Sequence, residues 1–297
     1  MATAFCPAHI TGFFKAELNK EDSKQLGSLG AGFSIQKGVK TTVTIRNKTK
    51  HDISNFTIKV NGFESGDMRV SEVVLSKFPT KEKFVDVIHE IDVPVGYGFG
   101  SSAAVALSLS IALNDALEFK LSKIKVAQIA HDVEIECKTG LGDVLASYHG
   151  GFEIRDKPGA PGIGHVQKIA LNEISIIMIC FSPISTSKFI KERLPQINGL
   201  GGKMVNKLLE SKNYEHFQEM SLEFAKYVDV MTPRMQKVVN ELSKNNIKCG
   251  IALFGETIFS MIPKEKENKV LEILKKYSDG IIIKSELDDV GARVLHN

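Results

Sequence analysis

Three glycines and two serines lie within seven residues of the stretch PVGYGFGSSAAVAL (94–107), before the sequence turns apolar. Gly96, Gly98 and Gly100 can adopt positive φ and let the backbone approach a phosphate closely. Unpaired N–H groups and the helix dipole favour an anion where a helix begins. Ser101 and Ser102 add hydroxyls that can cap a helix or contact a phosphate or Mg²⁺. The run is typical of a phosphate site or of a serine-capped buried helix, and the pattern alone leaves both open.

This run differs from two common phosphate motifs. No lysine follows its last glycine, as it would in G-x-x-x-x-G-K-[ST], and the spacing G-x-G-x-G is not the G-x-G-x-x-G of a βαβ dinucleotide unit. The loop therefore has no cation of its own. The charge of a bound phosphate must be neutralised by the helix terminus and by a metal held elsewhere.

A first candidate for holding that metal is Glu134, which falls on the apolar side of the helix expected over 122–138, between Ala130 and Cys137. A buried carboxylate is costly unless it is paired or bound to a metal. His131 is one turn away and shares this face. The alternative interpretation is a glutamate at the rim of the stripe beside a core histidine.

A second acid, Asp143, follows Gly140 and Gly142 at the expected start of a short helix. Aspartate is a favoured N-cap, so a cap is one interpretation. The other is that both acids face one pocket. One would then hold Mg²⁺ with Ser102, and the other would accept or orient the proton of a substrate hydroxyl.

Strand and helix patterns around these residues suggest how they are positioned. Alternating segments in the first 90 residues predict strands, including 41–47, 55–62 and 84–95. An apolar pattern predicts a buried helix over 102–117, and Ser122 is the expected N-cap of the next helix. A strand (GFEIR) and a Pro/Gly-rich loop (157–165) follow.

The second half of the chain has a different order of elements. An apolar strand over 174–182 precedes helical segments between about 187 and 246, two short strands, a helix and a strand (DGIIIKS). This is the β-α-β-β-α-β order of ferredoxin-like domains, with extra helices. We expect two domains, 1–165 and 166–297, with a ligand site in the cleft between them.

Composition narrows the class of protein. The chain has 297 residues, of which 43% are hydrophobic and 25% charged, and a net charge of +3, so it has no nucleic-acid footprint. Four scattered cysteines indicate a reducing compartment rather than disulfides or zinc. Neither a signal peptide nor a membrane span is predicted. We expect a cytoplasmic α+β protein without nucleic-acid or membrane partners.

The segment PVGYGFGSSAA (94–104) resembles the P-x-x-x-G-L-G-S-S-A-A signature of the GHMP small-molecule kinases, with Phe99 in place of leucine. The resemblance implies an N-terminal domain like domain 2 of ribosomal protein S5, a ferredoxin-like C-terminal domain, ATP and Mg²⁺. The segment GIALFGETIFSM (250–261) lies where the third motif belongs but lacks its run of glycines, so its nucleotide role stays open. The nucleotide is expected to contact Pro94, Gly96, Gly98, Phe99, Gly100, Ser101, Ser102 and Ala103.

Within these kinases, five blocks resemble the archaeal pantoate kinase family: PAHITGFF (7–14), GSLGAGF (27–33), GYGFGSSAA (96–104), AHDVEIECKTGLGDVLAS (130–147) and GARVL (291–295). By position, Ser102 and Glu134 resemble the Mg²⁺ ligands and Asp143 the catalytic acid. The implied reaction phosphorylates the 4-hydroxyl of pantoate for coenzyme A synthesis. The candidates for binding pantoate are Ser28, His131, Arg155 and Thr186.

Other interpretations stay open at this stage. Arg155 is either a carboxylate clamp or a solvated side chain, and Thr186 is either a ligand or a helix cap. His9 and Thr11 either border the pocket or belong to the start of a strand. A homoserine or mevalonate type of kinase and a non-catalytic nucleotide sensor are the alternative functions. A homodimer is expected.

Overall fold

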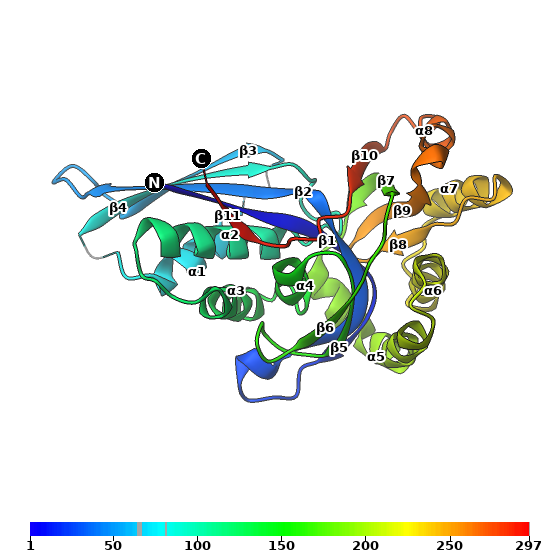
Figure 1. Ribbon diagram of the computed structural model, residues 1–297, viewed down its shortest axis with the longest axis horizontal. Coiled ribbons are helices and arrows are strands. Elements are labelled where there is room, and N and C mark those ends of the chain that lie inside the picture. Colours follow the sequence, from blue (N-terminus) through cyan, green and yellow to red (C-terminus); the bar gives the residue numbers. More distant parts are fainter. Residues whose placement is uncertain (64–66, 81, 297) are drawn as a thin grey trace.

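The computed structural model describes residues 1–63, 67–80 and 82–296 and contains two β-sheets flanked by helices (Figure 1). Seven strands form the first sheet, in the order β11-β1-β2-β4-β3, with β5 on β2 and β6 on β5. These strands are β1 (Ala2–Glu17), β2 (Gly27–Asn47), β3 (Phe56–Gly62), β4 (Lys83–Ile91), β5 (Phe152–Lys157), β6 (His165–Ile169) and β11 (Arg293–Leu295).

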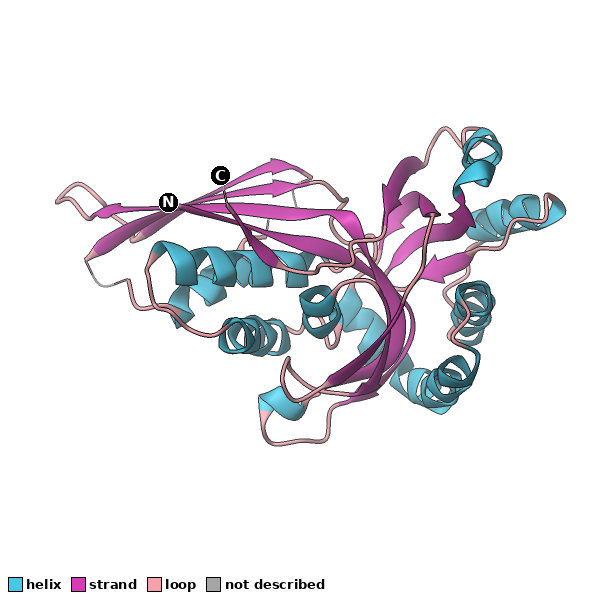
Figure 2. Ribbon diagram, in the orientation of Figure 1, coloured by secondary structure: helices cyan, strands magenta, loops and turns pink. Residues whose placement is uncertain are grey.

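Helices of the first half lie along one face of this sheet (Figure 2). They are α1 (Arg69–Lys77), α2 (Ser101–Ala116), α3 (Lys123–Cys137) and α4 (Asp143–His149), and a short 3-10 turn, η1 (Ser23–Gln25), precedes β2. The apolar pattern of 102–117 is confirmed, because α2 is buried on nearly every side. Ser122 caps α3 by accepting a hydrogen bond from the Lys125 N–H, as predicted.

The second sheet has the order β10-β7-β9-β8, which confirms the ferredoxin-like prediction. Its strands are β7 (Ile174–Pro183), β8 (Gly250–Ala252), β9 (Gly255–Pro263) and β10 (Ile281–Glu286). Its helices are α5 (Thr186–Ser211), α6 (Tyr214–Tyr227), α7 (Pro233–Lys244) and α8 (Glu267–Leu274), with the 3-10 turn η2 (Lys264–Lys266) before α8.

The two sheets do not divide the chain strictly at residue 165. Strand β6 starts there but pairs with β5, and β11 pairs with β1, so the end of the chain returns to the first sheet. Both termini accordingly lie near each other in Figure 1. Two domains meeting close to residue 165 remain our proposal, with β6 and β11 assigned to the N-terminal one.

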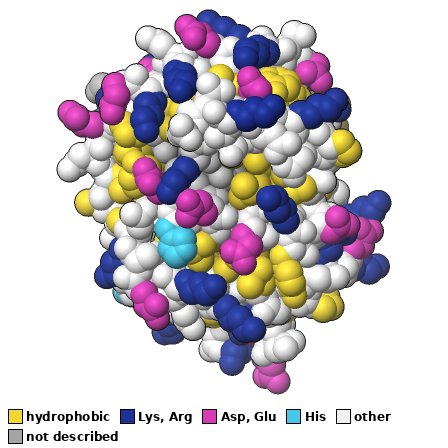
Figure 3. Space-filling model, turned by 90° about the vertical axis from the view of Figure 1, so that its right-hand side faces the viewer, with side chains coloured by type: hydrophobic (Ala, Val, Ile, Leu, Met, Phe, Trp, Pro, Cys, Tyr) yellow, Lys and Arg dark blue, Asp and Glu magenta, His cyan; other side chains and the backbone are white. Residues whose placement is uncertain are grey.

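Packing between the two halves is extensive. Phe13 and Phe33 from the first sheet contact Phe217 of α6, and Phe33 also contacts Phe259 of β9. Within the described residues, no helix is long and apolar enough to span a membrane. Lys and Arg side chains are interspersed with Asp and Glu on the face shown in Figure 3, and apolar side chains form small groups between them.

Candidate active site

The glycine run connects β4 to α2 and places the start of α2 at a cavity. Gly96, Gly98 and Gly100 all have positive φ, at 85°, 85° and 56°, so the predicted backbone conformation is confirmed. Gly100 is the N-cap of α2, and no side chain caps the helix. The serine-capped interpretation was therefore wrong. The first N–H groups of α2 have no side-chain acceptor, and this leaves them available to an anion.

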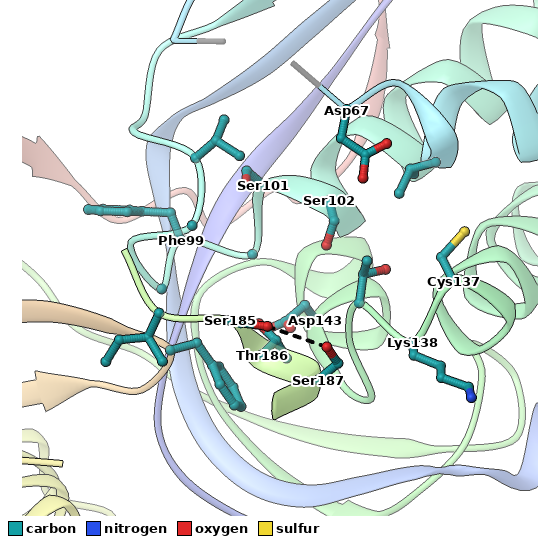
Figure 4. Close-up of a pocket in the computed structure, with 18 of the residues that line it drawn as sticks. Asp67, Phe99, Ser101, Ser102, Cys137, Lys138, Asp143, Ser185, Thr186 and Ser187 are labelled. Atoms are coloured by element: carbon teal, nitrogen blue, oxygen red, sulfur yellow. Dashed lines mark hydrogen bonds between the residues drawn. The ribbon is translucent and has the colours of Figure 1, made fainter. Parts of the chain in front are cut away.

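A cavity of about 420 Å³ lies in front of these N–H groups. The glycine run, the start of α1, the end of α3 and the start of α5 form its walls. In Figure 4, Ser102, Asp143 and Thr186 surround this cavity from α2, α4 and α5. Elements from both halves of the chain thus meet at one site. Its lining also includes Thr11, Asp67, Arg69, Cys137, Lys138, Thr139, Ser187 and Phe254.

Glu134 and Asp143 approach each other across Gly140. A methyl group at Gly140 would lie 2.2 Å from Glu134 Oε2 and 3.2 Å from Asp143 Oδ2. Glu134 is only 2% exposed, so it is not a rim residue. Burial raises its pKa to about 7; the Thr139 and Ser102 hydroxyls oppose this shift, and the charge of Asp143 adds to it. An acid in this state favours a compensating cation.

The residues present fit a magnesium ion. Oε2 of Glu134 is buried without a hydrogen-bond partner, and Ser102 is close enough for its hydroxyl to influence the Glu134 carboxyl. Among the residues that the structure describes, no group of three or more His, Cys, Asp or Glu could hold a metal by itself. A site with few protein ligands suits Mg²⁺, which usually shares its coordination sphere with nucleotide phosphates and water.

Asp143 is fixed by contacts from the first sheet. It is the first residue of α4, whose N-cap is Gly142, so the cap interpretation was wrong. Its Oδ1 lies 2.8 Å from His9 Nδ1. Burial raises the pKa of Asp143, but the hydrogen bond and charge of His9, the charge of Arg155 and the Thr11 hydroxyl together outweigh burial, so the pKa is lowered. Asp143 is therefore held ionised at the edge of the cavity.

Comparison with known proteins identifies the family. Residues 68–151 match the model of the GHMP kinases N terminal domain. A pantoate kinase of Methanocaldococcus jannaschii is 34% identical over 91% of this chain and 96% of that protein. Another, of Thermococcus kodakarensis, is 30% identical over 91% of each. The chain belongs to the pantoate kinase family of GHMP kinases.

Solved structures agree with this membership. A phosphotransferase related to the CoA biosynthesis pathway has a TM-score of 0.87 at 28% identity, covering 98% of this chain and 97% of that one. A homoserine kinase from Cytophaga hutchinsonii shares the fold, with a TM-score of 0.67 at 18% identity, covering 99% of this chain and 97% of that one. Membership in the family implies ATP as the phosphoryl donor.

The residues predicted to bind the family's acceptor divide into two groups. Ser28 and Thr186 line a small cavity of about 10 Å³ that also contacts Asp143, Thr11 and Phe254. Thr186 lines the larger cavity as well, so the two cavities adjoin. The structure thus brings two of the four predicted acceptor ligands to Asp143.

Arg155 and His131 do not line either cavity. Arg155 is 1% exposed and donates to Glu153, so neither a solvated side chain nor a direct carboxylate clamp fits its position. Nε2 of His131 faces the carbonyl of Ser23, 3.1 Å away, because His131 turns toward the η1 segment instead of Glu134. Direct contact of either residue with substrate is not supported.

Two residues predicted to contact the nucleotide also lie outside the larger cavity. Pro94 and Ala103 are absent from its lining, and Ala103 is fully buried. Pro94 precedes the loop and Ala103 faces the core from the first turn of α2.

The third motif supports the glycine loop from behind. A methyl group at Gly255 would lie 2.3 Å from the backbone of Tyr97, and the Thr257 hydroxyl donates to the Tyr97 carbonyl. Phe254 has a φ of 68°, which is strained for a bulky residue, and its ring lines both cavities. These contacts leave no room for a side chain at Gly255.

Three charged residues of the larger cavity were not predicted from the sequence. Asp67 and Arg69 stand at the start of α1, a helix that the sequence did not predict, and the Arg69 N–H donates to Asp67 Oδ1. Lys138 ends α3 in the left-handed conformation, with a φ of 58°. Asp67 before the apolar pattern of α1 was the available signal, since aspartate commonly precedes a helix.

Proposed function

We propose that this protein transfers the γ-phosphoryl group of ATP to the 4-hydroxyl of pantoate and releases 4-phosphopantoate and ADP, as a step of coenzyme A biosynthesis. The observation that carries this proposal is the meeting of Glu134 and Asp143 across Gly140, beside the uncapped start of α2. Phosphoryl transfer needs an anion cradle, a metal ligand and an acid at the acceptor. The start of α2, Glu134 and Asp143 would supply these three, in a chain of the pantoate kinase family.

The triphosphate binds at the start of α2. Its oxygens accept hydrogen bonds from the N–H groups that follow Gly100, and the dipole of α2 adds positive charge. Ser102 and Glu134 would hold Mg²⁺, and the bound ion would supply the positive charge that this lysine-free loop does not have. Arg69 and Lys138 line the same cavity and add positive charge to its wall.

The acceptor lies between Asp143 and the small cavity. Its 4-hydroxyl donates to the ionised Asp143 carboxylate, which orients the oxygen toward the γ-phosphorus. Ser28 and Thr186 offer hydroxyls to the polar groups of pantoate. Phe254 and Phe14, whose rings lie 5.6 Å apart, provide apolar surface for its methyl groups. No covalent intermediate is required, because positioning and charge suffice for a loose transition state.

The direct test is ADP release, coupled to a detectable reaction, with pantoate, homoserine and mevalonate as acceptors. We expect turnover of pantoate alone, and ³¹P NMR of the product should place the phosphate on the 4-oxygen. Turnover of another alcohol in place of pantoate would refute the acceptor assignment. Binding of ATP without turnover of any alcohol would favour a nucleotide sensor.

The role of Asp143 is tested in the same assay. Asp143→Ala should lower kcat by about 10²-fold or more while ATP still binds. Asp156→Ala is a matched control, since Asp156 is a half-buried aspartate of β5 that pairs with His165 outside both cavities. A homodimer and a cytoplasmic location stay predictions of the sequence, and size-exclusion chromatography with light scattering tests the first.

A further inference from the structure

His9 is a fully buried histidine that lies beside the candidate catalytic acid. It sits on β1 between two irregularities of the β1–β2 pairing, at Pro7/Ala8 and at Thr11/Phe13. Such bulges redirect side chains next to active sites. The N–H of His9 donates to the carbonyl of Phe99, which ties this part of β1 to the glycine loop. The position of His9 is thus determined by the sheet and by the nucleotide loop together.

Both ring nitrogens of His9 face carboxylates. Nδ1 lies 2.8 Å from Asp143 Oδ1, and Nε2 lies 3.0 Å from Glu153 Oε1. A neutral imidazole with its N–H at Nδ1 would accept at Nε2 from Arg155 Nη1, 3.3 Å away, but it would also turn that lone pair toward the nearer Glu153 Oε1. Only the imidazolium donates to both. Burial and the charge of Arg155 lower the pKa of His9, but the hydrogen bonds of Asp143 and Glu153 and the charge of Glu153 together outweigh them, so its pKa is raised.

The contacts continue beyond His9 to a buried arginine. Nη1 of Arg155 donates to the same Glu153 oxygen, and Nη2 donates to Thr11 Oγ1 at 3.3 Å. The side chains of Glu153 and Arg155 are both nearly inaccessible to solvent. Asp143, His9, Glu153 and Arg155 therefore form a row of alternating charges, which we call the buried charge row. Removing one member of such a row leaves a neighbour buried without its partner.

We propose that His9 is a positioning residue, which holds Asp143 ionised and aimed at the acceptor hydroxyl while Glu153 and Arg155 hold His9. The proposal rests on the proposed function, because it assigns Asp143 to the acceptor. A histidine that already donates from both nitrogens has no free site for a proton. The proton of the acceptor hydroxyl therefore does not pass to His9; it leaves on an oxygen of the transferred phosphoryl group, while Asp143 stays ionised as a fixed orienting charge.

The buried charge row also gives Arg155 a role without substrate contact. Arg155 lies behind Gly142, since a methyl group there would be 2.9 Å from its Nε and 2.4 Å from Ser28 Oγ. From this place it neutralises Glu153 and supports the wall of the small cavity. The charged groups that face His9 are Asp143, Glu153 and Arg155.

The first test measures the charge of His9 without relying on turnover. Ring ¹⁵N shifts of histidine-labelled full-length protein, assigned by difference with His9→Asn, should show imidazolium at pH 7.5. In Asp143→Asn, the pH at which His9 loses its proton should fall by at least one unit. A neutral His9 at pH 7.5 in the wild-type protein would overturn the proposal, whatever substrate the protein uses.

The second test is kinetic. His9→Ala should lower kcat with pantoate by about 10²-fold, leave the KM for ATP nearly unchanged, and move the acid limb of kcat/KM to higher pH. His9→Asn, which keeps a donor near Nδ1, should recover part of kcat. His89→Asn removes another buried histidine as control and should lower Tm without moving the acid limb. An unmoved acid limb in His9→Ala, or the same movement in His89→Asn, would show a structural role only.

Failure of the wild-type protein to turn over pantoate would contradict the proposed function. The ¹⁵N experiment would still decide the protonation state of His9.

Discussion

Gly140→Ala is a substitution that should damage the metal site while leaving the fold intact. No positive φ is required at Gly140, so the backbone accepts alanine. The new methyl group would lie 2.2 Å from Glu134 Oε2, where ordinary contact begins at 3.4 Å. The oxygen must therefore move by about 1 Å, and it can, because it ends a flexible side chain. Metal–ligand distances tolerate only about ±0.2 Å, so the displaced carboxylate no longer coordinates.

The expected effect of Gly140→Ala is a loss of about 10²-fold in kcat/KM at fixed Mg²⁺, or roughly 2.7 kcal/mol in the transition state. Titration of the initial rate with Mg²⁺ should show a higher requirement, and Mg²⁺ with ADP should raise Tm less than in the wild-type protein. Gly199→Ala is the matched control, because its methyl group would meet only the Tyr227 hydroxyl at 3.3 Å. An unchanged Mg²⁺ requirement in Gly140→Ala would refute the proximity of the metal to Glu134 and Gly140.

Three further predictions concern stability. Glu134→Gln should stabilise the metal-free protein at pH 8 but not at pH 4.5. Because the pKa of Glu134 is raised to about 7, its contribution to the free energy of unfolding is fully present below pH 4.5 and is lost as pH rises through 7. At pH 8 the unfolding free energy of Glu134→Gln, measured with urea, should exceed that of the wild-type protein by about 3 kcal/mol. Equal unfolding curves for the two proteins at both pH values would contradict this prediction. Burial lowers the pKa of His89 from 6.5 to about 4, so the free energy of unfolding should decrease as the pH is lowered from 6.5 to 4. Over the same pH range, His89→Leu should lose less unfolding free energy than the wild-type protein, by about 3 kcal/mol at most. Gly98→Ala should destabilise the protein by about 3 kcal/mol in calorimetry, because φ is 85° and its methyl group would lie 2.4 Å from the Leu253 carbonyl; an unchanged Tm would refute this reasoning.

Local chemistry made several features predictable from the sequence. The positive φ of the loop glycines, the Ser122 cap and the apolar helix at 102–117 depend on residues within one or two turns of the chain. The β-α-β-β-α-β order of the second half predicted its ferredoxin-like sheet, because the strands and helices could each be recognised from local patterns. Short-range patterns of this kind report backbone preference and burial directly.

The identity of the cap of α2 was not predictable from composition. Serine and glycine are both acceptable at an N-cap, and only the conformation of Gly100 decides between them. Likewise, helical spacing placed His131 beside Glu134, but His131 turns to the carbonyl of Ser23, which comes from a segment that its own helix does not specify.

By itself, the sequence determined the positive-φ glycine loop before α2, the two acids on either side of Gly140, and the resemblance to a kinase family. Tertiary structure decided what surrounds those acids. His9 lies 134 residues from Asp143 along the chain, and 144 residues from Glu153, so no periodicity links them. Pairing of β1 with β2, and of β2 with β5, brings His9, Glu153 and Arg155 together. Burial then excludes water, and this exclusion makes their charges strong enough to hold Asp143 ionised.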